Sequence, residues 1–165
     1  MAVIRDGKLV DSTWQFGNLN DPLPNGPLIV PFARWQTERA KILGETRPYI
    51  GVSLNSEESI EELSTDLAHL QAVALDFPVF KDGRHYTTAR LLRERYRFQG
   101  DIIATGDVLI DQLYFMQRVG FNVMVLRDDQ DAATALSVLA RRPATYQAAA
   151  DEKQPFYRRR NTVLS

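Results

Sequence analysis

Four short apolar runs rich in β-branched residues are the feature that most constrains the fold of this chain. They cover residues 49–54, 72–77, 101–105 and 121–126, and a segment with helical periodicity follows each of them. Alternating strands and helices are typical of βα units, whose strands lie parallel and are joined by right-handed crossovers. We therefore predict an α/β fold with four consecutive βα units in a parallel sheet. The sheet could be open or TIM-like, and we favour a half-barrel.

Start signals delimit the helices that follow these runs. Ser59 and Glu62 have the spacing of a capping box for the first helix. Thr87 or Thr88 is expected to cap the second helix, and the third is expected to begin at Asp107.

The first 30 residues depart from this rhythm. Asp6-Gly7 between two β-prone runs predicts a hairpin, residues 12–16 could extend its second strand, and a loop rich in Asn, Pro and Gly follows. A helix is expected from Pro31 to Gly44. We predict a single domain over 1–165, with an N-terminal hairpin and loop (1–30), an α/β core (31–147) and a C-terminal tail (148–165).

Composition argues against several classes of function. The net charge is −1 and acidic and basic residues are mixed, so we expect no nucleic-acid partner and treat the three arginines at 158–160 as part of a solvated tail. The absence of cysteine excludes a disulfide framework, a thiol nucleophile and a thiolate metal site. The N-terminus lacks a signal-peptide core and no window is apolar enough to span a membrane, so we expect a cytoplasmic protein.

The carboxyl ends of the strands are the expected ligand site, because ligands bind there in parallel α/β folds. The loop that follows residues 72–77 is the longest of these connections and holds Lys81, Gly83 and Arg84. Long loops in compact domains are often functional. Lys81 and Arg84 beside a helix N-terminus would suit a small anion such as sulfite, sulfate, phosphate or a carboxylate.

A structural interpretation competes with this site. Asp82 would then make a turn, and Arg84 would pair with Asp76 or Asp107. For Asp107 we favour a helix N-cap over a catalytic carboxylate. Asp111, one turn later, could share a face with Asp107, but no third ligand is in view and we predict no metal site.

The remaining chemical signals are weak. We favour an exposed loop position for His85 over a role as a general acid or base. The sequence contains no G-x-G-x-x-G, G-x-x-x-x-G-K-[ST] or G-x-S-x-G motif. Dinucleotide binding, P-loop chemistry and an α/β-hydrolase elbow therefore have no direct support, and any cofactor is unknown.

Three segments resemble a known family. They read LDFPVFKDGRHYTTARLLRERYRFQGDI, ATGDVLIDQLYFMQRVGFN and RDDQD, and the likeness extends from about Pro31 to Gln147. They resemble a bacterial family of uncharacterised conserved proteins, a domain of unknown function, whose genes commonly neighbour that of the sulfite/nitrite reductase hemoprotein. Its members are described as oxidoreductases involved in sulfite reduction.

The resemblance marks motif positions but brings no established catalytic residues. The candidates for catalysis are Asp76, Asp82 and Asp107. The residues expected to bind an anion or substrate are Lys81, Gly83, Arg84, Tyr86, Arg90, Thr105 and Gly106. The other motif positions are Phe77, Phe80, Arg93, Asp111 and Gln112.

The function implied by the resemblance is an accessory role in assimilatory sulfite reduction. The sulfite reductase hemoprotein is then a partner, and an anion such as sulfite or sulfate is the ligand. Gene neighbourhood is an association and not a mechanism. Because the sequence holds no cofactor motif and no redox-active cysteine, it leaves open whether the chain is an enzyme.

Two alternatives stay open. The first is a small-molecule enzyme with oxidoreductase or lyase-like activity, in which Lys81 and Arg84 clamp an anion and Asp76, Asp82 or Asp107 is the acid or base. The second is a non-catalytic subunit whose exposed sheet edges are covered by self-association. A homo-oligomer is expected.

Overall fold

The computed structural model describes residues 2–11, 14–45, 47, 49–78 and 83–141. Phe80, Lys81 and Asp82 lie outside these ranges, as does the C-terminal tail with its three arginines. Within them no helix combines the length and the apolar composition needed to span a bilayer.

One sheet of eight strands organises the fold, and helices flank it. The strands are β1 Val3–Arg5, β2 Lys8–Val10, β3 Gln15–Phe16, β4 Leu28–Pro31, β5 Ile50–Leu54, β6 Ala72–Phe77, β7 Asp101–Gly106 and β8 Val123–Val125. The α-helices are α1 Phe32–Gly44, α2 Ile60–Leu63, α3 Arg84–Glu94, α4 Leu113–Val119 and α5 Ala132–Ala140. Two 3₁₀ helices, η1 Ser64–His69 and η2 Ile110–Gln112, precede β6 and α4.

The strand order confirms the predicted parallel α/β architecture. It is β2-β1-β8-β7-β6-β5-β4-β3, and β3 to β8 pair in parallel while β1 is antiparallel to both of its neighbours. The four predicted strands are β5, β6, β7 and β8. Neighbours in sequence are neighbours in space, the order that repeated right-handed βα units produce.

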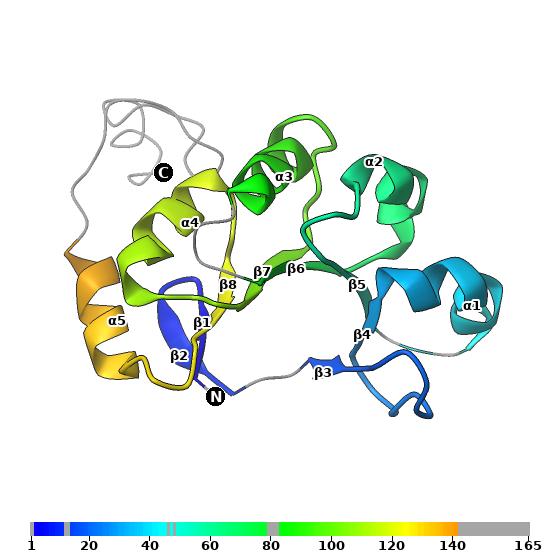
Figure 1. Cartoon of the computed structure of the whole chain (residues 1–165), viewed down its shortest axis with the longest axis horizontal. Coiled ribbons are helices and arrows are strands. Elements are labelled where there is room, and N and C mark those ends of the chain that lie inside the picture. The colour runs from blue at the N-terminus through cyan, green and yellow to red at the C-terminus, as the bar shows by residue number, and fades with distance from the viewer. Residues whose placement is uncertain (1, 12–13, 46, 48, 79–82, 142–165) are drawn as a thin grey trace, which may run out of the picture.

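The sheet curls into the predicted half-barrel, and the α-helices line its outer side (Figure 1). Its outermost strands, β2 and β3, are separated in the sequence only by residues 11–14. A fully extended chain from Val10 to Gln15 spans at most about 18 Å, so the two edges must lie close together. The hairpin is confirmed at Asp6-Gly7, where both residues have positive φ. Residues 15–16 do not extend β2 as expected, because they pair with β4 at the far edge.

The two faces of the sheet pack differently. The outer face forms the main core against the helices, with Trp35, Phe77 and Leu92 among its buried side chains. The inner face is filled by small or β-branched residues: Val3, Ile29, Ala72, Ala74, Ile103 and Val123. The inside of the half-barrel is therefore apolar midway along the strands.

A charged cluster closes the inner face at the amino ends of the parallel strands. Asp101, the first residue of β7, accepts hydrogen bonds from both terminal nitrogens of Arg5 at 2.8 and 2.6 Å. Trp14 Nε1 and Asn122 Nδ2 also donate to this carboxylate, at 3.2 and 2.9 Å. Burial raises the pKa of Asp101, but these hydrogen bonds outweigh it and leave the pKa of this carboxyl below its ordinary value.

Because of this cluster, we expect the stability of the protein to fall in acid. Because the pKa of Asp101 is lowered by folding, its stabilisation is complete above the unfolded-state pKa and is lost as the pH falls through the folded-state pKa. We expect Asp101→Asn to be less stable than wild type near neutral pH and the difference to shrink in acid. Urea unfolding of both proteins over a pH series measures this. A stability difference independent of pH would contradict it.

Two helix starts differ from the sequence prediction. Ser59 is the N-cap of α2, but its hydroxyl accepts from the backbone of Glu61, at 3.2 Å. The second helix starts at Arg84 after an N-cap at Gly83, so neither threonine caps it, and Thr88 instead donates to the Arg84 carbonyl inside the helix. The intrahelical bond satisfies the hydroxyl that was expected to cap.

Candidate functional site

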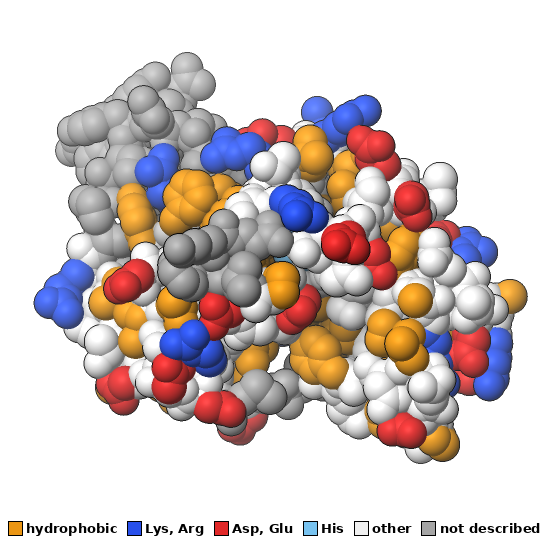
Figure 2. Space-filling view, in the orientation of Figure 1, with side chains coloured by type: hydrophobic (Ala, Val, Ile, Leu, Met, Phe, Trp, Pro, Cys, Tyr) orange, Lys and Arg blue, Asp and Glu red, His pale blue; other side chains and the backbone are white. Residues whose placement is uncertain are grey.

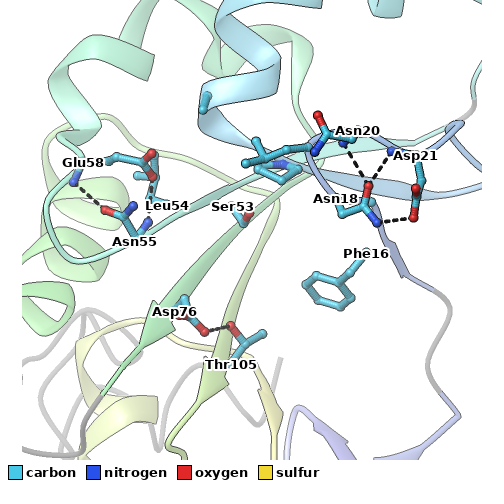
Figure 3. A pocket seen from close by; sticks show the side chains of 14 residues that line it. Phe16, Asn18, Asn20, Asp21, Ser53, Leu54, Asn55, Glu58, Asp76 and Thr105 are labelled. Atoms are coloured by element: carbon cyan, nitrogen blue, oxygen red, sulfur yellow. Dashed lines mark hydrogen bonds between the residues drawn. The ribbon is translucent and has the colours of Figure 1, made fainter.

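The inner face becomes polar where the parallel strands end. Side chains alternate along a strand, so Asp76 lies on the same face as Ala72 and Ala74, and Thr105 on the same face as Ile103. Asp76 and Thr105 are paired in register on β6 and β7. The Thr105 hydroxyl donates to Asp76 Oδ1 at 3.1 Å, and the two side chains point toward one another (Figure 3). A carboxylate and a hydroxyl therefore lie at the mouth of the half-barrel.

A cleft of about 690 Å³ opens above this pair. It is lined by Phe16, Gly17, Asn18, Leu19, Asn20, Asp21, Pro31, Ala33, Ser53, Leu54, Asn55, Glu58, Asp76 and Thr105. These residues come from the carboxyl ends of β3 to β7 and the loops that follow them. The volume lies within the range of small-molecule pockets, and the position is the one that parallel α/β folds use for ligands.

The N-terminal loop forms one wall of the cleft, and its shape is held by hydrogen bonds. Asn18 Oδ1 accepts from the backbone of Asn20 and Asp21, and Asn18 Nδ2 donates to the Asp21 carboxylate. From α1, the buried Arg34 donates to the carbonyls of Asn18 and Asp21 at 2.8 and 2.7 Å and pairs with Glu38. The Asn- and Pro-rich composition of these residues predicted a loop but not its place at the cleft.

The opposite wall follows β5. Asn55 Oδ1 accepts from the backbone of Glu57 and Glu58, and the Glu58 carboxylate accepts from the backbone of Asn55 at 2.8 Å. Figure 3 shows these two side chains across the cleft from the loop of Asn18. This turn orients Glu58 toward the cavity. The sequence did not predict this position for Glu58.

The cleft lining is acidic. Asp21, Glu58 and Asp76 line it, and among the described lining residues there is no lysine or arginine. Figure 2 shows hydrophobic, acidic and basic side chains interspersed on the displayed face, without a continuous basic area. In the ranges that the structure describes, no three His, Asp or Glu side chains are grouped to hold a metal ion.

The predicted anion-binding segment lies beside the cleft lining. Gly83 and Arg84 are exposed at the start of α3, and Arg84 Nη1 donates to the Ser56 carbonyl at 3.1 Å. Neither residue is in the described lining of the cleft. Since Lys81 and Asp82 lie outside the described residues, anion binding by this segment stays a prediction.

Asp107 is not the helix N-cap that the sequence suggested. The N-cap of η2 is Leu109, and Asp107 instead accepts from Arg127 at 2.5 Å. Arg127 also binds Asp129, whose pKa falls to about 2 because of this hydrogen bond, while the pKa of Arg127 rises. Asp107 therefore belongs to an ion-pair network after β7 and β8 and is not among the residues that line the cleft.

The first turn of α3 faces the core on one side. His85, expected in an exposed loop, is 1% exposed and packs edge-on against Phe77 with ring centroids 5.4 Å apart. Tyr86 contacts Phe77, Phe115 and Phe121, and burial raises the pKa of its hydroxyl. Helix α3 begins earlier than predicted, which turns both side chains inward, away from the cleft.

Four further candidate residues, Phe77, Arg90, Asp111 and Gln112, are not in the described lining of the cleft. Phe77 is 1% exposed in the outer core. Arg90 forms an exposed ion pair with Glu94 at 3.5 Å. Asp111 is exposed in η2, and Gln112 is the N-cap residue of α4.

Arg93 binds at the amino ends of the strands, far along the sheet from the cleft. It donates to the carbonyls of Phe98, Gly100 and Gly120 and to Asn122 Oδ1. These acceptors precede β7 and β8, so the guanidinium joins the end of α3 to both strand starts. Burial lowers the pKa of Arg93.

Gly106 shapes the floor of the cleft at the end of β7. Its φ is +85°, and a Cβ placed there would overlap the Phe77 carbonyl oxygen and lie 2.8 Å from Asp76 Oδ1. Only glycine lets β7 approach Asp76 this closely. Gly106, which was predicted to contact substrate, lets β7 lie close to Asp76 in this structure.

Comparison with protein families supports the resemblance seen in the sequence. The model of a family described as bacterial protein of unknown function (DUF934) matches residues 51–157, well over half of the chain. The chain belongs to this family. Comparisons of this DUF934 protein with curated proteins and with solved structures give no match.

The DUF934 match divides the cleft into two parts. Ser53, Glu58, Asp76 and Thr105 lie within the matched residues, whereas the wall at residues 17–21 precedes them. The polar floor therefore belongs to the part of the chain that defines the family.

Proposed function

We propose that this protein binds a small molecule in the cleft and acts as a cytoplasmic accessory protein in assimilatory sulfite reduction. The observation that carries the binding proposal is the cleft itself, at the carboxyl ends of the strands with Asp76 and Thr105 on its floor. The sulfite-reduction role is supported by the family resemblance, and the sulfite reductase hemoprotein is the proposed partner.

The described cleft residues fit binding and proton transfer better than electron transfer. Their polar groups are carboxylates, hydroxyls and amides, which accept and donate hydrogen bonds but do not change oxidation state under cellular conditions. An electron-transfer role would need a cofactor in addition to these side chains.

A second candidate is a small-molecule enzyme in the same cleft, with Asp76 as its acid or base. The hydrogen bond from Thr105 fixes the Asp76 carboxylate at the cavity floor and leaves its other oxygen available for a ligand. In this proposal Asp76 is preferred over Asp107 as the catalytic carboxylate, because Asp76 lines the cleft and Asp107 does not.

Deletion of the gene in a bacterium that carries it tests the proposed role. We expect slow growth with sulfate or sulfite as the sole sulfur source and normal growth on cysteine, because only the first condition requires sulfite reduction. Growth at the wild-type rate on sulfate would refute the role. Failure to grow on cysteine as well would refute it too, since the requirement would then not be specific to sulfite reduction.

A further inference from the structure

The cleft combines two kinds of side chain. Its carboxylates lie around it, with Asp21 on the N-terminal loop, Glu58 on the opposite wall and Asp76 on the floor. Two apolar side chains also line it, Phe16 at the end of β3 and Leu19 in the loop that follows. Together the carboxylates and the apolar side chains restrict the class of molecule that the cleft can hold.

The carboxylates favour a ligand that donates hydrogen bonds. The hydrogen bonds to Asp21, Glu58 and Asp76 described above come from a side-chain amide, a backbone N–H and a hydroxyl, which are all neutral. An ionised carboxylate offers about four acceptor positions, so each retains capacity for a ligand. Because the described lining contains no lysine or arginine, a bound cation gains from all three charges and a bound oxyanion is repelled by them.

The two exposed apolar side chains favour a ligand with a ring or a hydrocarbon part. Phe16 is 48% exposed and Leu19 is 56% exposed. They are two of the five large hydrophobic side chains that are exposed in the described ranges, and both line this one cavity. Covering them with ligand removes apolar surface from water, and the Phe16 ring can also face a cation. Figure 3 shows this ring on the side of the cleft opposite Asn55 and Glu58.

We propose that the cleft binds an organic amine, with its ammonium group on Asp76 and its apolar or aromatic part on Phe16 and Leu19. The inference rests on the proposed function in that it uses the same cleft. It changes the expected chemistry, because the carboxylates of the described lining disfavour sulfite and similar oxyanions. Gly83 and Arg84, at the start of α3, are not in this described lining.

Titration of the purified full-length protein with three probes tests the charge preference. Phenethylamine and phenylacetate share a ring but have opposite charges, and sulfite is the small anion. By calorimetry we expect phenethylamine to bind with a Kd of roughly millimolar or tighter, and the two anions at least tenfold more weakly. No binding of phenethylamine at about ten times that concentration, or equal binding of either anion, would overturn the proposal.

Matched variants test the location. Asp76→Asn and Phe16→Ser are each expected to weaken phenethylamine binding about tenfold, the loss of one charge-assisted contact or one apolar contact. Glu94→Gln and Leu9→Ser are the controls, because Glu94 is exposed on α3 and Leu9 is 53% exposed, and neither lines the cleft. Equal weakening in the controls, or none in the cleft variants, would refute this location.

The outcome is separable from that of the proposed role. Amine binding with normal growth of the deletion strain on sulfate would leave the ligand class standing and refute sulfite reduction. A growth defect on sulfate with no preference for phenethylamine would support the role in sulfite reduction and refute the amine as the ligand class.

Discussion

Arg93→Met is expected to lower the free energy of unfolding by about 3 kcal/mol or more. The guanidinium donates to three backbone carbonyls at 2.8 to 3.0 Å and to Asn122 Oδ1 at 3.2 Å. Methionine keeps much of the side-chain length but removes every donor, so half-buried acceptors lose their partners. Urea denaturation followed by circular dichroism measures the change.

Arg90→Met is the control for this experiment. Arg90 lies on the same helix, is 45% exposed and is paired with Glu94 at 3.5 Å. Exposed pairs of this kind contribute about 0.5 kcal/mol or less. Similar losses of unfolding free energy in the two variants would contradict the stabilising role of the hydrogen bonds from Arg93 to the strand starts.

Gly106→Ala is expected to destabilise the protein by about 3 kcal/mol. An L-residue at φ +85° is strained, and the added Cβ would overlap the Phe77 carbonyl, which accepts from the Asp107 backbone at 2.8 Å. Relief of the overlap must move β7 away from β6 and so displace Thr105 from Asp76. We expect ligand binding in the cleft to weaken along with stability, measured by thermal unfolding and by phenethylamine titration.

Gly44→Ala provides the matched control. Gly44 ends α1, has no positive φ, and a Cβ there would meet nothing within 4 Å. Alanine favours the helix over glycine by up to about 1 kcal/mol, so stability should stay the same or rise. A Gly106 variant as stable as this control would contradict the close approach of β7 to β6.

The parallel core could be predicted from sequence because its signals are local. The β-branched runs of β5 to β8 and the apolar periodicity of the helices each lie within a short window. The strand β4 was missed because Leu28 to Pro31 run directly into α1 with no intervening turn. The strand β3 was assigned to the wrong neighbour because two residues, Gln15 and Phe16, carry no signal that identifies β4 as their partner.

Part of the site could also be predicted from local signals. The rule that ligands bind at strand ends selected Asp76 and Thr105, which do line the cleft. It could not select Phe16 or Asn18, because they reach the mouth only through the pairing of β3 with β4, at the edge of the sheet opposite β2. Long-range closure of a sheet has no short-range sequence pattern.

The loop charges that look most functional in the sequence were harder to interpret. Arg84 and His85 seemed to lie in a loop, but α3 starts at Arg84, which buries His85 against Phe77. Asp107 looked like a cap, yet its partner Arg127 lies 20 residues later in the chain. Helix starts and ion pairs depend on distant residues that local patterns do not contain.

The growth of the deletion strain carrying Asp76→Asn tests the central claim, that the cleft is the functional site. Asparagine keeps the shape of the side chain and can still accept from Thr105, but it removes the charge. With protein levels matched by immunoblot, we expect wild type and Glu94→Gln to restore growth on sulfate and Asp76→Asn not to restore it. Full restoration by Asp76→Asn would contradict it.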